Sequence, residues 1–151
     1  MANLVKQFLS KQDLADIAGA IAEQEKRTSG ELRVAIRQKR SRKEKTLSVE
    51  QLARLEFVHL GMRKTEERTG VLIFILLESR EFFILADEHI NEKVGPSVWQ
   101  GVAQAMAARF ATKEYRQGLL DAVRAVTDHL ASHFPARAGD KNELPNDVDI
   151  S

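Results

Sequence analysis

Residues 70–77 read Gly-Val-Leu-Ile-Phe-Ile-Leu-Leu, which is seven consecutive apolar side chains after a glycine. A run of this length, rich in strand-forming residues, predicts a strand that is buried on both faces. The polar segment Glu78–Glu81 and a second apolar run, Phe82–Ala86, come next, and they predict an antiparallel hairpin. A strand that is apolar throughout needs helices on both faces of its sheet.

The rest of the chain supplies one more strand and those helices. Leu32, Val34 and Ile36 recur at every second position, the pattern of a strand with one covered face. Apolar residues at helical spacing predict helices over about 11–27, 49–62, 98–110 and 119–134. The order of these elements predicts an α/β fold, a three-layer α/β/α sandwich with a small mixed sheet: a parallel crossover plus the hairpin, covered by helices on both faces.

The composition suits one domain and excludes several kinds of site. The chain has 151 residues, of which 43% are hydrophobic and 30% charged. It has no cysteine, so disulfide scaffolds, cysteine-ligated metals and thiol nucleophiles are excluded, and any metal must bind oxygen or imidazole ligands. We expect a single domain over residues 1–135, with a polar, partly ordered C-terminal tail over 136–151.

The distribution of charge and hydropathy bears on partners and location. The net charge of +1 is too balanced for a dedicated nucleic-acid binder unless the charge is segregated along the chain. No apolar run approaches the roughly 18–20 residues that cross a bilayer, and Lys6 interrupts the apolar N-terminus. The sequence therefore predicts no membrane span and a cytoplasmic protein.

The predicted topology gives the sheet an acidic edge and a basic edge. If the first two strands are parallel and the third is antiparallel, Glu31, Thr69 and Asp87 meet at one edge. The segment 37–45 lies at the opposite edge together with Arg80, and it contains six Lys or Arg residues.

Several motifs resemble the TPM domain family, also known as the thylakoid lumen 18.3 kDa, Psb32 and MOLO-1 group. In chain order they are Glu25-x-x-Thr28-Ser29-Gly30-Glu31, Phe57-x-x-Leu60-Gly61-Met62-x-x-Thr65, Arg68-Thr69-Gly70, Phe83–Asp87, Trp99, Phe134-Pro135 and Asn142–Pro145. The resemblance implies an α/β/α sandwich and places the chain in a small soluble subgroup that lacks a signal peptide and membrane segment. Members of the family are associated with acid phosphatase activity, with divalent-cation binding and with assembly or repair of membrane complexes.

The acidic edge is the predicted metal site. Its candidate ligands are carboxylates, which suit Ca²⁺ or Mg²⁺: Glu25, Glu31, Asp87 and Glu88. The alternative is that each residue has only a structural role, as a helix cap or as one partner of an ion pair. Glu25 could form such a pair with Arg68, and the Thr28 hydroxyl could hold the turn through a hydrogen bond to the backbone.

Two further groups of residues have a functional and a structural interpretation. The basic segment 37–45 could bind a protein or another anionic partner, or it could be a solvated loop without a role; the anion-binding candidates are Lys39, Arg40, Arg42 and Lys43. His129 and His133 have metal-ligand spacing, but no third ligand is evident, and their apolar neighbours favour histidines at the edge of the core. No nucleic-acid motif and no nucleotide-binding or hydrolase motif occurs.

The sequence thus predicts a divalent-cation-binding TPM-type domain that acts as an interaction or accessory module. The alternative is a low-activity, metal-dependent acid phosphatase acting on phosphomonoesters. In that case the metal would polarise a phosphoryl oxygen and activate a water.

Overall fold

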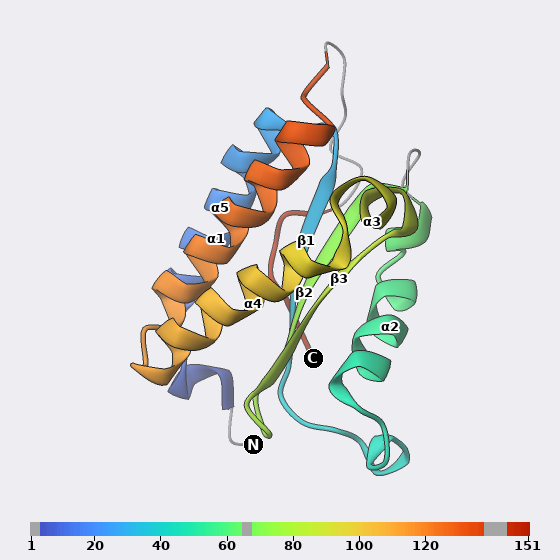
Figure 1. Cartoon of the computed structure of the whole chain (residues 1–151). Coiled ribbons are helices and arrows are strands. Elements are labelled where there is room, and N and C mark those ends of the chain that lie inside the picture. The colour runs from blue at the N-terminus through green and yellow to red at the C-terminus, as the bar shows by residue number, and fades with distance from the viewer. Residues whose placement is uncertain (1–3, 65–67, 138–144) are drawn as a thin grey trace.

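A mixed sheet forms the centre of the computed structural model, which describes residues 4–64, 68–137 and 145–151 (Figure 1). Its strands, in spatial order, are β3 (Glu81–Ala86), β2 (Gly70–Leu76), β1 (Glu31–Arg37) and β4 (Asp149–Ile150). β1 and β2 are parallel, with Glu31 beside Gly70, whereas β2 and β3 are antiparallel, with Val71 beside Ala86. The predicted parallel crossover and hairpin are confirmed.

Helices cover both faces of this sheet (Figure 1). One face carries α1 (Lys11–Gln24), α4 (Pro96–Ala111) and α5 (Tyr115–His133), and the other carries α2 (Val49–His59). The buried strand β2 contributes to both cores, because Ile73 packs on the first side and Phe74 on the second. The three-layer α/β/α sandwich predicted from the sequence is confirmed.

Local sequence determines where several elements begin and end. Ser10 and Asp13 form a capping box at the start of α1, since the Ser10 hydroxyl accepts from Asp13 N at 3.0 Å and Asp13 Oδ2 accepts from Ser10 N at 2.9 Å. The helix predicted over 11–27 is α1 followed by a 3₁₀ turn. The short 3₁₀ turns are η1 (Leu4–Gln7), η2 (Glu25–Arg27), η3 (Arg42–Glu44) and η4 (Met62–Lys64).

Two elements were not predicted from the sequence. The helix α3 (Glu88–Val94) directly follows β3. It is short and buries only Ile90, so its sequence shows no helical repeat of apolar residues. The strand β4 has two residues, which pair in parallel with Ala35 and Ile36 of β1. The C-terminal tail therefore contributes to the sheet at its end.

Some residues quoted for the family resemblance lie outside the described ranges, namely Thr65 and Asn142–Leu144. The same holds for residues 138–144 of the predicted tail. Within the described ranges, none of the helices has the length and apolarity that crossing a membrane requires.

Candidate functional site

One edge of the sheet collects the starts of β1 and β2 and the end of β3. Glu31 N donates to Thr69 O at 3.1 Å, and Asp87 N donates to Gly70 O at 2.9 Å. Glu31 and Asp87 therefore lie in one row of the sheet, on either side of Gly70. The predicted convergence of Glu31, Thr69 and Asp87 at one edge is confirmed, because the strand directions are those expected.

Met62 lies between the two carboxylate residues of this row. Gly70 has no side chain, and the place of a Cβ atom there would be 3.4 Å from both Met62 Cε and Met62 O. The Met62 side chain is fully buried. Strands two places apart are separated by about 10 Å, so the thioether of Met62 fills the space through which Glu31 and Asp87 would have to meet.

Glu31 instead forms a carboxyl pair with Glu25. β4 pairs with β1 only at Ala35 and Ile36, so the edge of β1 near Leu32 has no neighbouring strand. Glu25 lies at this edge, where Leu32 N donates to Glu25 Oε2 at 3.4 Å. Burial raises the pKa of Glu25 to about 10, and the hydrogen bond with Glu31 and its negative charge act in the same direction. At neutral pH the Glu25 carboxyl group is therefore in its protonated form, which can donate a hydrogen bond to Glu31.

Thr28 positions this pair by holding the turn between η2 and β1. Its hydroxyl is buried, donates to Phe134 O at 2.5 Å and accepts from Gly30 N at 3.0 Å. Ser29 N donates to the same carbonyl at 2.9 Å. The structural interpretation of Thr28 is the one that the contacts support, and it ties the end of α5 to the start of β1.

Asp87 has a different partner from the one it would have in a shared cation site. Arg68 Nε lies 3.1 Å from Asp87 Oδ2, and Arg68 Nη2 lies 3.2 Å from Asp87 Oδ1. Asp87 Oδ1 also accepts from Glu88 N at 2.8 Å, so the same side chain caps α3. Asp87 is buried, whereas Glu88 is exposed and lies 4.0 Å from Arg68 Nη2.

The four predicted ligands thus form two pairs rather than one cluster. Glu25 contacts Glu31, while Asp87 and Glu88 face the guanidinium of Arg68. Among the described residues, no three or more metal-ligating side chains lie close enough to hold an ion together. The Arg68–Asp87 pair takes the place of the Glu25–Arg68 pair that the sequence left open.

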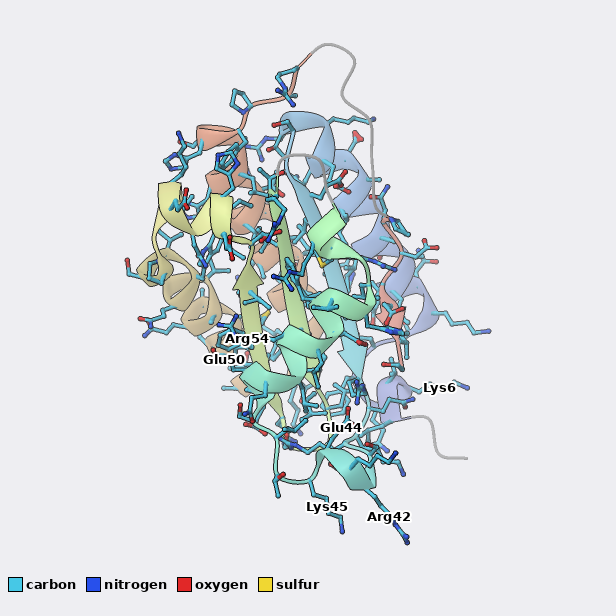
Figure 2. All side chains as sticks on the ribbon, turned by 90° about the vertical axis from the view of Figure 1, so that its right-hand side faces the viewer. Lys6, Arg42, Glu44, Lys45, Glu50 and Arg54 are labelled. Carbon is cyan, nitrogen blue, oxygen red and sulfur yellow. The ribbon has the colours of Figure 1, made fainter. Side chains whose placement is uncertain are left out.

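The basic segment divides into residues with internal partners and residues that face solvent. Arg37 Nη1 lies 2.6 Å from Glu44 Oε1, and Arg40 Nε donates to Leu47 O at 3.0 Å. Lys39, Arg42 and Lys43 are exposed. Figure 2 shows Arg42 pointing away from the fold. Of the four anion-binding candidates, Arg40 therefore has a structural role, and the other three are accessible to a partner.

Sequence reasoning missed a polar pocket beside Asp87. The pocket has a volume of about 260 Å³ and lies between α2, β3 and α3. Three arginines line it, Arg54, Arg63 and Arg68, together with Asp87 and Glu88. Their separation along the chain, on α2, η4 and the start of β2, carries no sequence signal.

The two histidines of α5 do not form a pair. His129 is half-buried, with its ring 6.0 Å from that of Trp99 in an edge-to-face arrangement, whereas His133 is exposed at the end of the helix. Trp99 and Met106 are buried in the core, and Phe110 packs against it.

Comparisons with known proteins agree with this architecture. The family model of the TPM domain matches residues 4–129. The chain is similar to the NMR structure of the BA42 protein from the psychrophilic bacterium Bizionia argentinensis, with a TM-score of 0.86 and 32% identity, over 95% of this chain and 96% of that chain. It also shares the fold of the N-terminal domain of a P. gingivalis protein, with a TM-score of 0.67 and 16% identity over 84% of this chain and 79% of that one. No curated protein matches it.

Proposed function

Because the chain belongs to the TPM domain family, we propose that it is a divalent-cation-binding domain acting as an interaction or accessory module, with Glu25 and Glu31 as its principal ligands. The observation that carries the proposal is the contact of these two carboxyl groups at the edge of β1, where burial and the neighbouring carboxyl group raise the pKa of Glu25. Glu25 Oε1 is buried and has no hydrogen-bond partner among the described residues. A cation that displaced the proton would give this oxygen a partner.

The exchange of a proton for a divalent cation is favourable on electrostatic grounds. Two adjacent carboxylates repel each other, and the proton relieves this repulsion with one positive charge. Mg²⁺ or Ca²⁺ would supply two charges at the same place, and both ions prefer carboxylate oxygens. With only two carboxylates the ion would keep several water ligands, which is the usual state of Mg²⁺.

Asp87 and Glu88 are the other two predicted ligands, and Arg68 competes with a cation for them. The guanidinium makes two contacts with Asp87, so a cation can reach this carboxylate only after Arg68 has moved away. Glu88 is exposed and can move without breaking a buried contact. We therefore expect Glu25 and Glu31 to dominate the affinity, and Asp87 and Glu88 to modulate it.

Calorimetric titration with MgCl₂ and CaCl₂ tests the proposal. Measured at pH 7 in two buffers of different ionisation enthalpy, binding should release about one proton per ion, because the ion replaces the proton of the Glu25 carboxyl group. Glu25→Gln and Glu31→Gln should each abolish binding and proton release. Glu23→Gln, at an exposed residue of α1 outside the site, is the matched control and should retain both. Full binding in the two glutamine variants, or none in the unaltered protein, would contradict the proposal.

The pocket of three arginines favours a second candidate function, that of a low-activity metal-dependent phosphatase. Arg54, Arg63 and Arg68 line a space next to Asp87, and guanidinium groups suit the geometry of a phosphate. A phosphomonoester bound there would place its phosphate beside two carboxylates. A metal held by those carboxylates would supply a polarised phosphoryl oxygen and an activated water.

Hydrolysis of p-nitrophenyl phosphate separates the two functions. The phosphatase hypothesis expects turnover that is lost with a chelator and in both Asp87→Asn and Arg63→Gln. Activity that persists in the Asp87→Asn preparation would come from a contaminating enzyme. Ion binding without any turnover would leave the accessory-module function as the better account.

A further inference from the structure

A cavity of about 310 Å³ lies at the end of the sheet opposite to Glu31 and Asp87. It is formed by the residues that follow η1, by the β2–β3 hairpin and by the region where α4 meets α5, which Figure 1 shows together at the same end of the molecule. Its inner surface is mainly aliphatic, with Ile36, Ile75 and Leu77 from the sheet and Leu119 from α5. This volume falls at the lower end of the range for small-molecule sites, about 300–1,000 Å³.

Aromatic rings form one wall of the cavity. Phe8 lies edge-to-face with Tyr115, with ring centroids 4.8 Å apart. Tyr115 packs in the same way on Phe110 at 5.5 Å, and Phe110 packs on Phe82 at 5.6 Å. All four rings line the cavity. Because each ring is fixed by its neighbours, the wall is preorganised for an apolar ligand.

Two cationic side chains, Arg80 and Lys113, also line this apolar cavity. Both residues are exposed, and in the part of the chain that the structure describes neither lies within 4.0 Å of a carboxylate. The guanidinium of Arg80 lies 6.0 Å from the centre of the Phe8 ring. The acidic residue of the lining, Glu81, interacts instead with Ser79 Oγ at 2.6 Å and with Arg40 Nη2 at 3.4 Å.

The backbone of both cationic residues is in the left-handed region, with φ of 55° at Arg80 and 64° at Lys113. This conformation is unfavourable for an L-residue and favours glycine or asparagine. Two basic side chains thus occupy positions that other residues would fill at lower cost. Strained positions of this kind gather at ligand sites, and here both line the same cavity.

We propose that this cavity binds a small monocarboxylate, with its acyl or aryl body against the aromatic wall and its carboxylate paired with Arg80 and Lys113. The apolar interior selects the body of the ligand, and the two cations select a single anionic head group. A neutral analogue would leave both cations without a counter-charge, and a cationic analogue would be repelled. This site is independent of the cation site proposed above, since the two share no residue.

Titration with octanoate, followed by ¹H–¹⁵N chemical shifts, tests the proposal on the whole chain. Octanoate should shift the amides of Leu77, Ala107 and Leu119. 1-Octanol should bind at least about tenfold more weakly, and octyltrimethylammonium weaker still. The affinity for octanoate should fall as NaCl rises from about 0.05 to 0.5 M, because both cations are exposed. Equal binding of octanol and octanoate, or no shift with octanoate, would overturn the proposal.

Two sets of variants locate the binding. Arg80→Asn and Lys113→Asn remove one charge each at positions where asparagine tolerates the left-handed backbone, so the fold is retained. Each should weaken octanoate binding about threefold or more and leave octanol binding unchanged. Ala107→Leu fills part of the cavity and should weaken both probes. Its matched control is Ala108→Leu, on the same helix and outside the cavity, which should weaken neither. Unchanged octanoate affinity in both asparagine variants, or equal effects of the two leucine variants, would refute the assignment.

Discussion

Arg68 donates two hydrogen bonds to the carboxylate of Asp87, from Nε at 3.1 Å and from Nη2 at 3.2 Å. The backbone of Arg68 is in the left-handed region, with φ of 57°. The Asp87 carboxylate raises the pKa of Arg68, through a hydrogen bond first and through its charge second. Asp87 also caps α3. One buried side chain therefore joins the start of β2 to the start of α3.

These two roles of Asp87 can be separated by substitution. Asparagine caps a helix as well as aspartate does, so Asp87→Asn loses only the ion pair, and we expect it to cost about 1 kcal/mol of the free energy of unfolding. Asp87→Ala loses the helix cap as well, and it should lower the free energy of unfolding by a further ~0.5–2 kcal/mol. Urea denaturation followed by the fluorescence of Trp99 measures both. Equal costs of the two variants would show that the cap contributes nothing.

The Glu25–Glu31 pair makes stability depend on pH in a definite direction. The pKa of Glu25 is raised from 4.5 to about 10 on folding, so the folded state keeps a proton that the unfolded state has released. The contribution of this proton to the free energy of unfolding is fully present below pH 4.5 and is lost as the pH rises toward 10. The free energy of unfolding should therefore fall with pH through this window, by at most about 1.4 kcal/mol per pH unit.

The variant Glu25→Gln checks this pH dependence, because glutamine is neutral at every pH and its amide can donate to Glu31. Urea denaturation at pH 5, 7 and 9 should show a slope in the unaltered protein and a smaller one in Glu25→Gln. Glu23→Gln is the matched control, since Glu23 is an exposed residue of α1, paired with Lys26, and its substitution should leave the slope in place. A slope that is the same in all three proteins would contradict the raised pKa of Glu25.

The sequence predicted the frame of the acidic edge because that frame depends on patterns. The apolar run at 71–77 identifies a strand buried on both faces, and the alternation at Leu32–Ile36 identifies its neighbour. The helical connection between them, which returns the chain to the same edge of the sheet, then makes them parallel. These steps place Glu31 and Asp87 at one edge without any knowledge of side-chain contacts.

The contacts within that edge depend on features that no pattern records. Met62 reaches Gly70 from η4, across the sheet face. The pairing of Arg68 with Asp87 depends on a left-handed backbone at Arg68, which sequence preferences disfavour for arginine. The strand β4 has two residues, too few for any periodicity. The sequence therefore predicts which residues lie at this edge of the sheet, but not which side chains they contact there.

The exposed part of the basic segment can be tested without disturbing the fold. We expect the triple variant Lys39→Ser, Arg42→Ser and Lys43→Ser to elute from heparin at lower salt than the unaltered protein, with the same melting temperature. Arg40→Ser should instead lower the melting temperature, because Arg40 donates to Leu47 O and lies 3.4 Å from Glu81. Unchanged elution of the triple variant would show that the segment is only a solvated loop.

Two helix glycines should respond in opposite directions to alanine, because only one of them has room for a Cβ atom. At Gly19 of α1 no atom lies within 4 Å of the added Cβ, so Gly19→Ala should stabilise the fold by about 0.5–1 kcal/mol through helix propensity. At Gly118 of α5 the Cβ would lie 2.8 Å from Phe110 Cε1 and 3.1 Å from Arg109 Cβ. Helix propensity is the same in both cases, so the difference between the variants isolates the steric contact.

For Gly118→Ala we expect a net loss of about 1–2 kcal/mol, since overpacking costs more than the helix propensity that alanine adds. Phe110 is held on its other sides by Phe82 and Tyr115, so its ring has little freedom to move away. Thermal unfolding of the two variants side by side measures the difference. A stabilised Gly118→Ala would mean that Phe110 yields to the methyl group, and the aromatic wall of the cavity would then be mobile rather than preorganised.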